Sequence, residues 1–265
     1  AKDFMLQILR HPYVKNGDAI GQIIEYAGEA VEALSVDERA TMTNMAAEVG
    51  AFTGIIAPDR KTVDYLVAQR GLSRGEAERL CEGLFSDPDA EYVKVIEIDT
   101  TELKPMIALP GDPGNGLFIE ELGAPVRIDV AYAGSCTAGK KADMDMYARV
   151  FREGLGRGRK VAAGVQCYIQ CGSREVFEYC RERGYDRVFA DVGAIFVEPS
   201  CGACINAGPG VSRKATDVTI SAINRNFPGR SGPGQLYLAS PYTVAASAIA
   251  GRICAWEPEG VPALV

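Results

Sequence analysis

Histidine is nearly absent from this chain, whose 265 residues include a single one, His11. A Ser-His-Asp hydrolase uses an imidazole as its general base, and catalytic zinc sites commonly use histidine ligands. Both classes of enzyme would be hard to build from this inventory. If the chemistry requires further imidazoles, we expect another chain to supply them.

Long apolar runs and an excess of positive charge are also missing. The apolar stretches are too short and too interrupted to span a bilayer, so we expect no membrane-spanning segment. No signal peptide is apparent at the N-terminus. The formal net charge of −7 argues weakly against nucleic acid as the main partner. The eight cysteines are spread through a large chain, where metal binding or free thiols are the more usual explanation than disulfides, so we expect the cytoplasm or another reducing compartment.

The pattern along the chain predicts an α/β protein. Strand-like apolar runs alternate with helical patterns, which is typical of βαβ units and a mainly parallel sheet. We expect two lobes, each with a mainly parallel sheet flanked by helices. The pattern changes to a Pro- and Gly-rich segment near residue 97, which divides the chain into domains 1–96 and 97–265.

Individual elements follow from periodicity and from capping residues. Ser35 with Glu38 forms a capping box, Asp59 can cap the next helix, and Gly71 suits its C-terminus. The predicted helices cover residues 2–10, 35–50, 59–70, 74–84, 141–153, 173–183 and 243–252. The predicted strands cover residues 20–26, 53–57, 92–98, 126–133, 161–170, 194–197, 217–223 and 236–239.

Three of the eight cysteines follow predicted strands directly. Cys136 stands in a Gly-Ser-Cys-Thr run, and Cys201 and Cys204 stand in a Cys-Gly-Ala-Cys turn. Since the carboxyl ends of parallel strands meet at one edge of a sheet, the three thiolates could converge. Three ligands are one fewer than a closed metal site needs, which suits a [4Fe–4S] cluster with one iron open to substrate. A zinc site or ordinary buried thiols are the alternatives.

Two further groups of polar residues could serve the same site. Arg225 and Arg230 lie on a Gly- and Pro-containing loop, and paired guanidinium groups can clamp carboxylates. A solvated loop with structural salt bridges is the alternative. Asn44 and Glu48 are four residues apart and therefore share a face of their predicted helix. Most such pairs simply form a polar helix face.

Together these segments resemble the aconitase superfamily in their order and approximate spacing. The resemblance rests on the cysteine-containing runs at 134–137 and 201–204 and on Asn-Arg-Asn-Phe-Pro-Gly-Arg at 224–230. It extends to the segments 25–28, 44–48 and 237–241, and so covers nearly the whole chain. The chain is most similar to the large subunits of isopropylmalate isomerase and homoaconitase-type enzymes.

The resemblance implies a role for each matching residue. It implies a [4Fe–4S] cluster on Cys136, Cys201 and Cys204, substrate binding by Asn224, Arg225 and Arg230, and catalytic roles for Asn44 and Glu48. The implied activity is that of a hydro-lyase, a dehydratase, hydratase or isomerase. Its substrate would be a small hydroxy di- or tricarboxylic acid such as isopropylmalate, homocitrate, a methylated malate or malate/maleate.

Departures from the family pattern concern partners and substrate. The chain looks like only the second and third domains of the family. We therefore expect partner chains to supply the first domain and the mobile small-subunit domain. Ala138 stands where many members have asparagine, which leaves the substrate open. The other interpretations are a non-catalytic RNA-binding relative, against which the net charge argues, and an inactive relic.

Overall fold

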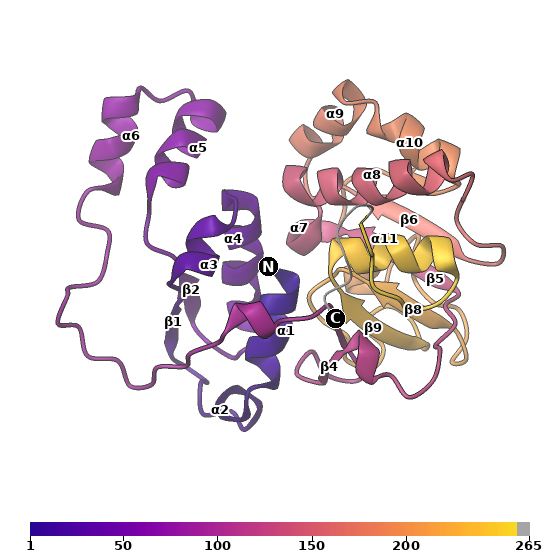
Figure 1. Cartoon of the computed structure of the whole chain (residues 1–265), viewed down its shortest axis with the longest axis horizontal. Coiled ribbons are helices and arrows are strands. Elements are labelled where there is room, and N and C mark those ends of the chain that lie inside the picture. The colour runs from indigo at the N-terminus through magenta and orange to yellow at the C-terminus, as the bar shows by residue number, and fades with distance from the viewer. Residues whose placement is uncertain (259–265) are drawn as a thin grey trace.

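The computed structural model describes residues 1–258, which form two groups of elements placed side by side (Figure 1). The first group surrounds a two-stranded sheet and the second a seven-stranded sheet. The elements of the first group are α1 (Lys2–Arg10), α2 (Pro12–Lys15), β1 (Ile23–Glu25), α3 (Glu29–Ala33), α4 (Val36–Asn44), β2 (Thr53–Ile55), α5 (Arg60–Arg70) and α6 (Arg74–Cys81). Short 3-10 turns cover Met45–Ala47 and Thr100–Glu102.

The second group begins with a hairpin and continues with strand–helix units. Its strands are β3 (Met106–Ala108), β4 (Gly116–Phe118), β5 (Val130–Gly134), β6 (Gln166–Gln170), β7 (Ile195–Val197), β8 (Val218–Ser221) and β9 (Gln235–Ala239). Its helices are α7 (Ser135–Ala138), α8 (Lys141–Gly156), α9 (Arg174–Glu182), α10 (Tyr185–Val192) and α11 (Pro241–Ala250). Ile119–Glu121 and Gly202–Ile205 form 3-10 turns.

The larger sheet has the strand order β4-β3-β9-β8-β5-β6-β7. Strands β5 to β9 are mutually parallel, whereas β3 and β4 add an antiparallel hairpin at one edge. The two strands of the smaller sheet are also parallel. The predicted α/β class with mainly parallel sheets is therefore confirmed. The predicted boundary near residue 97 stays a prediction.

The larger sheet is buried on both faces, as parallel sheets usually are. Successive residues of a strand point to opposite faces. Ala131 and Ala133 of β5 lie in the core shared with α8, α10 and α11, whereas Val130 and Tyr132 lie in the core that includes α1 and α4. The first group of elements thus packs on one face of the sheet that the second group builds.

Helix ends follow the chemistry expected from the sequence. The Ser35 hydroxyl accepts the Glu38 N–H at 3.3 Å, and the Glu38 carboxylate accepts the Ser35 N–H at 3.1 Å. Asp59 accepts the Thr62 N–H at 3.2 Å at the start of α5, and Gly71 ends that helix with a φ of +67°. Within residues 1–258, no helix combines the length and the apolar character that crossing a bilayer requires.

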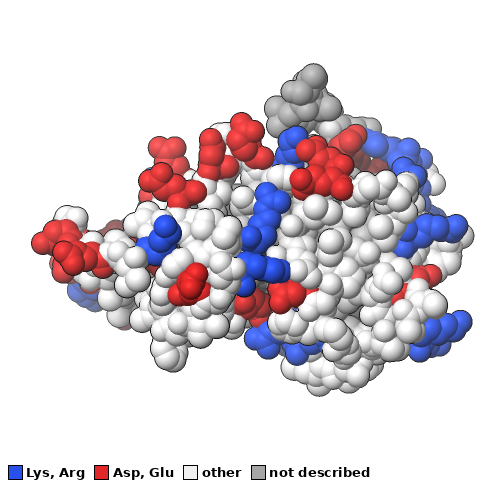
Figure 2. Space-filling view, turned by 90° about the horizontal axis from the view of Figure 1, so that it is seen from below, with Lys and Arg blue, Asp and Glu red and all other residues white. Residues whose placement is uncertain are grey.

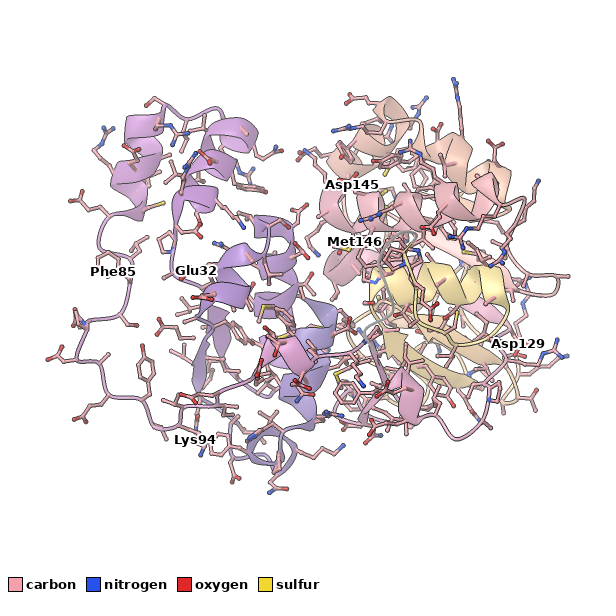
Figure 3. The ribbon with its side chains drawn as sticks, viewed as in Figure 1. Glu32, Phe85, Lys94, Asp129, Asp145 and Met146 are labelled. Carbon is pink, nitrogen blue, oxygen red and sulfur yellow. The ribbon has the colours of Figure 1, made fainter. Side chains whose placement is uncertain are left out.

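The predicted strand over residues 92–98 is wrong. Within residues 1–258 this segment pairs with no strand. It belongs to the long connection between α6 and the larger sheet, along which Phe85 and Lys94 are labelled in Figure 3. Val93 is 87% exposed. A β-branched run favours strand geometry, but only a hydrogen-bonded neighbour turns it into a strand. The hairpin β3–β4 and helix α10 were not predicted.

Candidate functional site

The order of the parallel strands places the predicted site residues at one edge of the sheet. From β5 the chain moves to β6 and β7 on one side, and then crosses to β8 and β9 on the other. Such a reversal is where open α/β sheets bind ligands, outside the carboxyl ends of the strands. Cys136 follows β5, Asn224 follows β8, and Cys201 and Cys204 follow β7.

The turn that carries Cys136 depends on closely packed backbone. A Cβ atom on Gly134 would lie 1.8 Å from the Gln170 carbonyl oxygen, and one on Gly139 would lie 2.3 Å from the Ser135 carbonyl oxygen. Ser135 itself has a φ of +72°, a conformation that non-glycine residues rarely adopt. This strained turn begins the short helix α7 and leaves Cys136 exposed.

The turn that carries the other two cysteines is fixed by neighbouring side chains. The Ser231 hydroxyl donates to the Ala203 carbonyl at 2.6 Å. The amide of Gln170 donates to the Ser200 hydroxyl at 2.6 Å and accepts from the Tyr132 hydroxyl. The loop that bears Arg230 and the end of β6 therefore both hold the residues around Cys201 and Cys204.

The structure places the three predicted cysteines in turns that follow the parallel strands β5 and β7, at the same edge of the sheet. Burial raises the pKa of the Cys204 thiol. A hydrogen bond with Ser135 lowers this pKa, the thiols of Cys136 and Cys201 raise it, and the charge of Arg230 lowers it. These groups act on Cys204 because they lie close to it. The remaining cysteines, Cys81, Cys167, Cys171, Cys180 and Cys254, are likewise free thiols.

The cysteines suit an iron–sulfur cluster better than a single metal ion. Among residues 1–258, no three Cys, His, Asp or Glu side chains are placed to hold a single metal ion. An iron–sulfur cube instead bonds each thiolate to a different iron, so its ligands surround a larger group. Two buried polar atoms of the predicted site residues, Glu48 Oε2 and Arg230 Nε, also have no hydrogen-bond partner in the described chain. A set of three thiols with two unpartnered polar atoms on neighbouring segments fits a cluster with a bound substrate.

Glu48 lies opposite the loop that follows β8. Its side chain is fully buried, and its Oε1 accepts hydrogen bonds from Asn224 Nδ2 at 2.8 Å and from Arg225 Nε at 2.6 Å. Within the described chain the terminal amino groups of Arg225 have no hydrogen-bond partner, and its side chain is 37% exposed. Arg225 can therefore bind Glu48 and an incoming carboxylate at once.

The prediction that a single helix carries both Asn44 and Glu48 is wrong. Helix α4 ends at Asn44, and a 3-10 turn over Met45–Ala47 separates the two residues. Exposed Asn44 accepts a hydrogen bond from the Thr137 hydroxyl at 3.0 Å, next to Cys136, whereas Glu48 contacts the loop after β8. Both residues reach the site, but on different elements of it.

Two residues that the sequence analysis did not assign join α4 to the cysteine turn. The Thr41 hydroxyl donates to the Thr137 carbonyl at 2.8 Å. The Lys140 ammonium donates to the Thr41 hydroxyl at 2.8 Å and to the same Thr137 carbonyl. Thr41 lies one helical turn before Asn44, so the spacing could have indicated that both side chains face the cysteine turn. Lys140 resembled an ordinary surface lysine.

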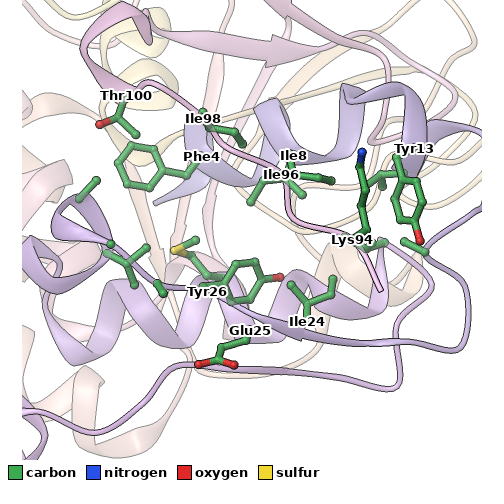
Figure 4. A pocket seen from close by; sticks show the side chains of 18 of the residues that line it. Phe4, Ile8, Tyr13, Ile24, Glu25, Tyr26, Lys94, Ile96, Ile98 and Thr100 are labelled. Atoms are coloured by element: carbon green, nitrogen blue, oxygen red, sulfur yellow. The ribbon is translucent and has the colours of Figure 1, made fainter. Parts of the chain in front are cut away.

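A separate cavity lies away from the cysteines. It has a volume of about 530 Å³ and is enclosed by α1, β1 and the connection around residues 92–101 (Figure 4). Its walls are mostly apolar, with Phe4, Ile8 and Ile24 facing the alternate residues Ile96 and Ile98. None of the predicted site residues lines this cavity.

Comparisons with known proteins match this arrangement. A model of the aconitase family (aconitate hydratase) matches residues 1–126 and 120–251. The chain is 40% identical over 242 residues to the 3-isopropylmalate dehydratase large subunit 1 of Pyrococcus furiosus, covering 90% of this chain and 54% of that protein. The chain belongs to the aconitase family.

Other members of the aconitase family give the same result. The 3-isopropylmalate dehydratase large subunit of Aquifex aeolicus is 39% identical over 237 residues, which are 89% of this chain and 53% of that protein. The corresponding protein of Clostridioides difficile is 37% identical over 254 residues, 95% of this chain and 57% of that protein. The chain thus spans about half the length of the curated relatives it matches. The resemblance inferred from the sequence is confirmed, while the role of each site residue stays a prediction.

Proposed function

We propose that this chain is part of a hydro-lyase that adds or removes water on a small hydroxy dicarboxylic acid. In this proposal Cys136, Cys201 and Cys204 hold a [4Fe–4S] cluster. When bound, the cluster would supply a Lewis acid for the substrate's hydroxyl and carboxylate oxygens. The observation that carries the proposal is that the turns bearing the three cysteines and the loop bearing Arg230 follow β5, β7 and β8, at the carboxyl edge of one parallel sheet.

Charged groups of this chain would bind and orient the substrate. Among residues 1–258 the amino groups of Arg225 and the buried Nε of Arg230 have no hydrogen-bond partner, so each side chain can hydrogen-bond a substrate carboxylate. Asn224 keeps Glu48 in place through its amide. Two separate cations suit a substrate with two carboxylates, in agreement with the dicarboxylic acids expected from the sequence.

Glu48 would hydrogen-bond the substrate hydroxyl, or the water, that is removed or added in the reaction. Its Oε1 accepts hydrogen bonds from Asn224 and Arg225, while Oε2 is buried and has no partner in the part of the chain that the structure describes. A buried, unpaired carboxylate oxygen is costly to maintain unless a ligand satisfies it. Oε2 is therefore the atom we expect to accept a hydrogen bond from the substrate hydroxyl. Asn44 would support this side of the site through Thr137.

Substrate and partners belong to the same proposal. The relatives are named 3-isopropylmalate dehydratase large subunits, which makes isopropylmalate the first acid to test, with homocitrate, methylated malates and malate/maleate as the others. Because these relatives are named large subunits, we expect a small-subunit partner. Because the chain matches only 54% of the length of the Pyrococcus furiosus relative, we also expect additional polypeptide to supply the first domain. The expected cytoplasmic location is also part of this proposal. On the face drawn in Figure 2, acidic and basic side chains are interspersed, which gives nucleic acid no uniform basic surface.

Cysteine replacement under anaerobic conditions tests the proposal. The chain, with its assembled subunits, is reconstituted with iron and sulfide, and both are quantified per chain together with the visible absorbance. Cys136→Ser, Cys201→Ser and Cys204→Ser should each abolish or severely reduce cluster content. Cys81→Ser, on α6, is the matched control and should retain it. Equal iron content in all four variants, or bound zinc in place of iron, would contradict the proposal.

A further inference from the structure

Lys2 is a buried cation on the first turn of α1. It is only 2% exposed, although lysine is almost never fully buried without a partner for its charge. Its ammonium group donates to the backbone carbonyls of Ala222, at 3.3 Å, and of Ile223. These bonds join two segments separated by more than two hundred residues and link the first group of elements to the end of β8.

Charged groups of the candidate site contribute to the pKa of Lys2. Burial lowers the pKa of the Lys2 ammonium to about 8. The carboxylate of Glu48 opposes this change, and weaker contributions come from Lys140, Asp3 and Cys204. Lys2 therefore lies within electrostatic reach of Glu48 and Cys204, two residues that we assign to substrate and cluster. The hydrogen bonds of Lys2, however, go to backbone carbonyls and not to the side chains of the site.

The carbonyls that Lys2 binds directly precede the substrate-binding loop. Ala222 and Ile223 are fully buried, and the next residues, Asn224 and Arg225, both hydrogen-bond to Glu48. On the other side, the Ala222 N–H donates to the Tyr132 carbonyl at 3.1 Å. The backbone between β8 and Asn224 is therefore held by β5 from one direction and by Lys2 from another.

We propose that Lys2 is a positioning residue, which fixes the backbone after β8 so that Asn224 and Arg225 meet Glu48 and a substrate carboxylate. This inference rests on the function proposed above. A neutral side chain in its place would leave two buried carbonyls without their donor. The loop after β8 would then lose its fixed position, and the substrate-binding side chains would move with it.

The test compares Lys2→Met with Arg39→Met. Arg39 is also a buried cation of the first group, but it binds Asp59 and the Glu32 carbonyl, away from the loop after β8. In Lys2→Met we expect hydrogen–deuterium exchange in a peptide spanning 222–228 to accelerate about tenfold, with no such change in Arg39→Met. In the assembled enzyme, the KM for the dicarboxylate should rise about tenfold in Lys2→Met. Its iron content should stay at the wild-type level.

The two readouts separate this inference from the proposed function. Exchange is measured without a cluster or substrate, so it reports on Lys2 even if the wild-type protein binds neither. The inference is overturned if both variants lose similar thermal stability while exchange over 222–228 stays at the wild-type rate in each. Lys2→Gln, which retains a donor without the charge, replaces Lys2→Met if the latter does not fold. It should give a smaller acceleration in the same peptide, and unchanged exchange there would also overturn the inference.

Discussion

Arg225 Nε lies 2.6 Å from Glu48 Oε1, joining residues 177 positions apart in the chain. Glu48 enters from the 3-10 turn after α4, and Arg225 enters from the loop after β8. The pair therefore forms only when the two groups of elements pack against each other. A buried carboxylate with one oxygen paired and the other free is suited to receive a ligand.

Glu48→Gln should lower kcat by at least about 100-fold, the usual scale for losing a positioned acid–base group. Glutamine keeps the shape of the side chain and removes the charge that Arg225 binds. Steady-state kinetics of the assembled enzyme measure this effect. Glu38→Gln is the control on the same chain segment, because glutamine can also complete the capping box with Ser35. A kcat reduced equally in both variants would show that Glu48 has no special role.

Arg225→Lys and Arg230→Lys should each raise the KM for the dicarboxylate, by about tenfold or more. Lysine keeps the positive charge but loses the planar arrangement of donors that matches a carboxylate. Arg213→Lys, an exposed position in the preceding loop, should leave KM unchanged. Substrate titrations of the three variants check this. Wild-type KM values in both site variants would place the carboxylates elsewhere.

The sequence could place the cysteines and the arginine loop at one edge of the sheet because each follows a strand, while their roles stay predictions. Capping residues at Ser35 and Asp59 located helix starts for the same local reason. Contacts over long separations could not be derived in this way. Nothing near Lys2 in the sequence indicates that it binds the carbonyls after β8, and nothing in residues 92–98 indicates that this β-branched run lacks a neighbouring strand.

Gly134→Ala should disrupt the turn that carries Cys136. Its φ of +122° is strained for any side chain, and the added methyl would lie 1.8 Å from the Gln170 carbonyl. We expect a loss of more than about 3 kcal/mol of stability together with loss of cluster binding. Urea unfolding and iron content measure the two effects. Gly158→Ala is the matched control: its φ of +67° is also positive, but nothing lies within 4 Å, so it should cost only about 1 kcal/mol. Equal losses in both variants would contradict the close packing at Gly134.

The ion pair between Arg39 and Asp59 should make stability depend on pH in acid. A hydrogen bond from Arg39 holds the pKa of the Asp59 carboxyl below its ordinary value of 3.8. Because the folded-state pKa is the lower one, the stabilisation is fully present above about pH 4 and is lost as the pH falls through the folded-state value. Because Asp59 is partly exposed and solvent screens the pair, Asp59→Asn should cost about 1 kcal/mol at pH 6, and the difference from wild type should shrink as the pH approaches 3. Urea unfolding across this range measures the difference.

The double variant Arg39→Met/Asp59→Asn isolates the pairwise contribution of the two side chains to stability. A difference between wild type and Asp59→Asn that stays constant from pH 6 to pH 3 would show that the carboxylate charge does not stabilise this lobe.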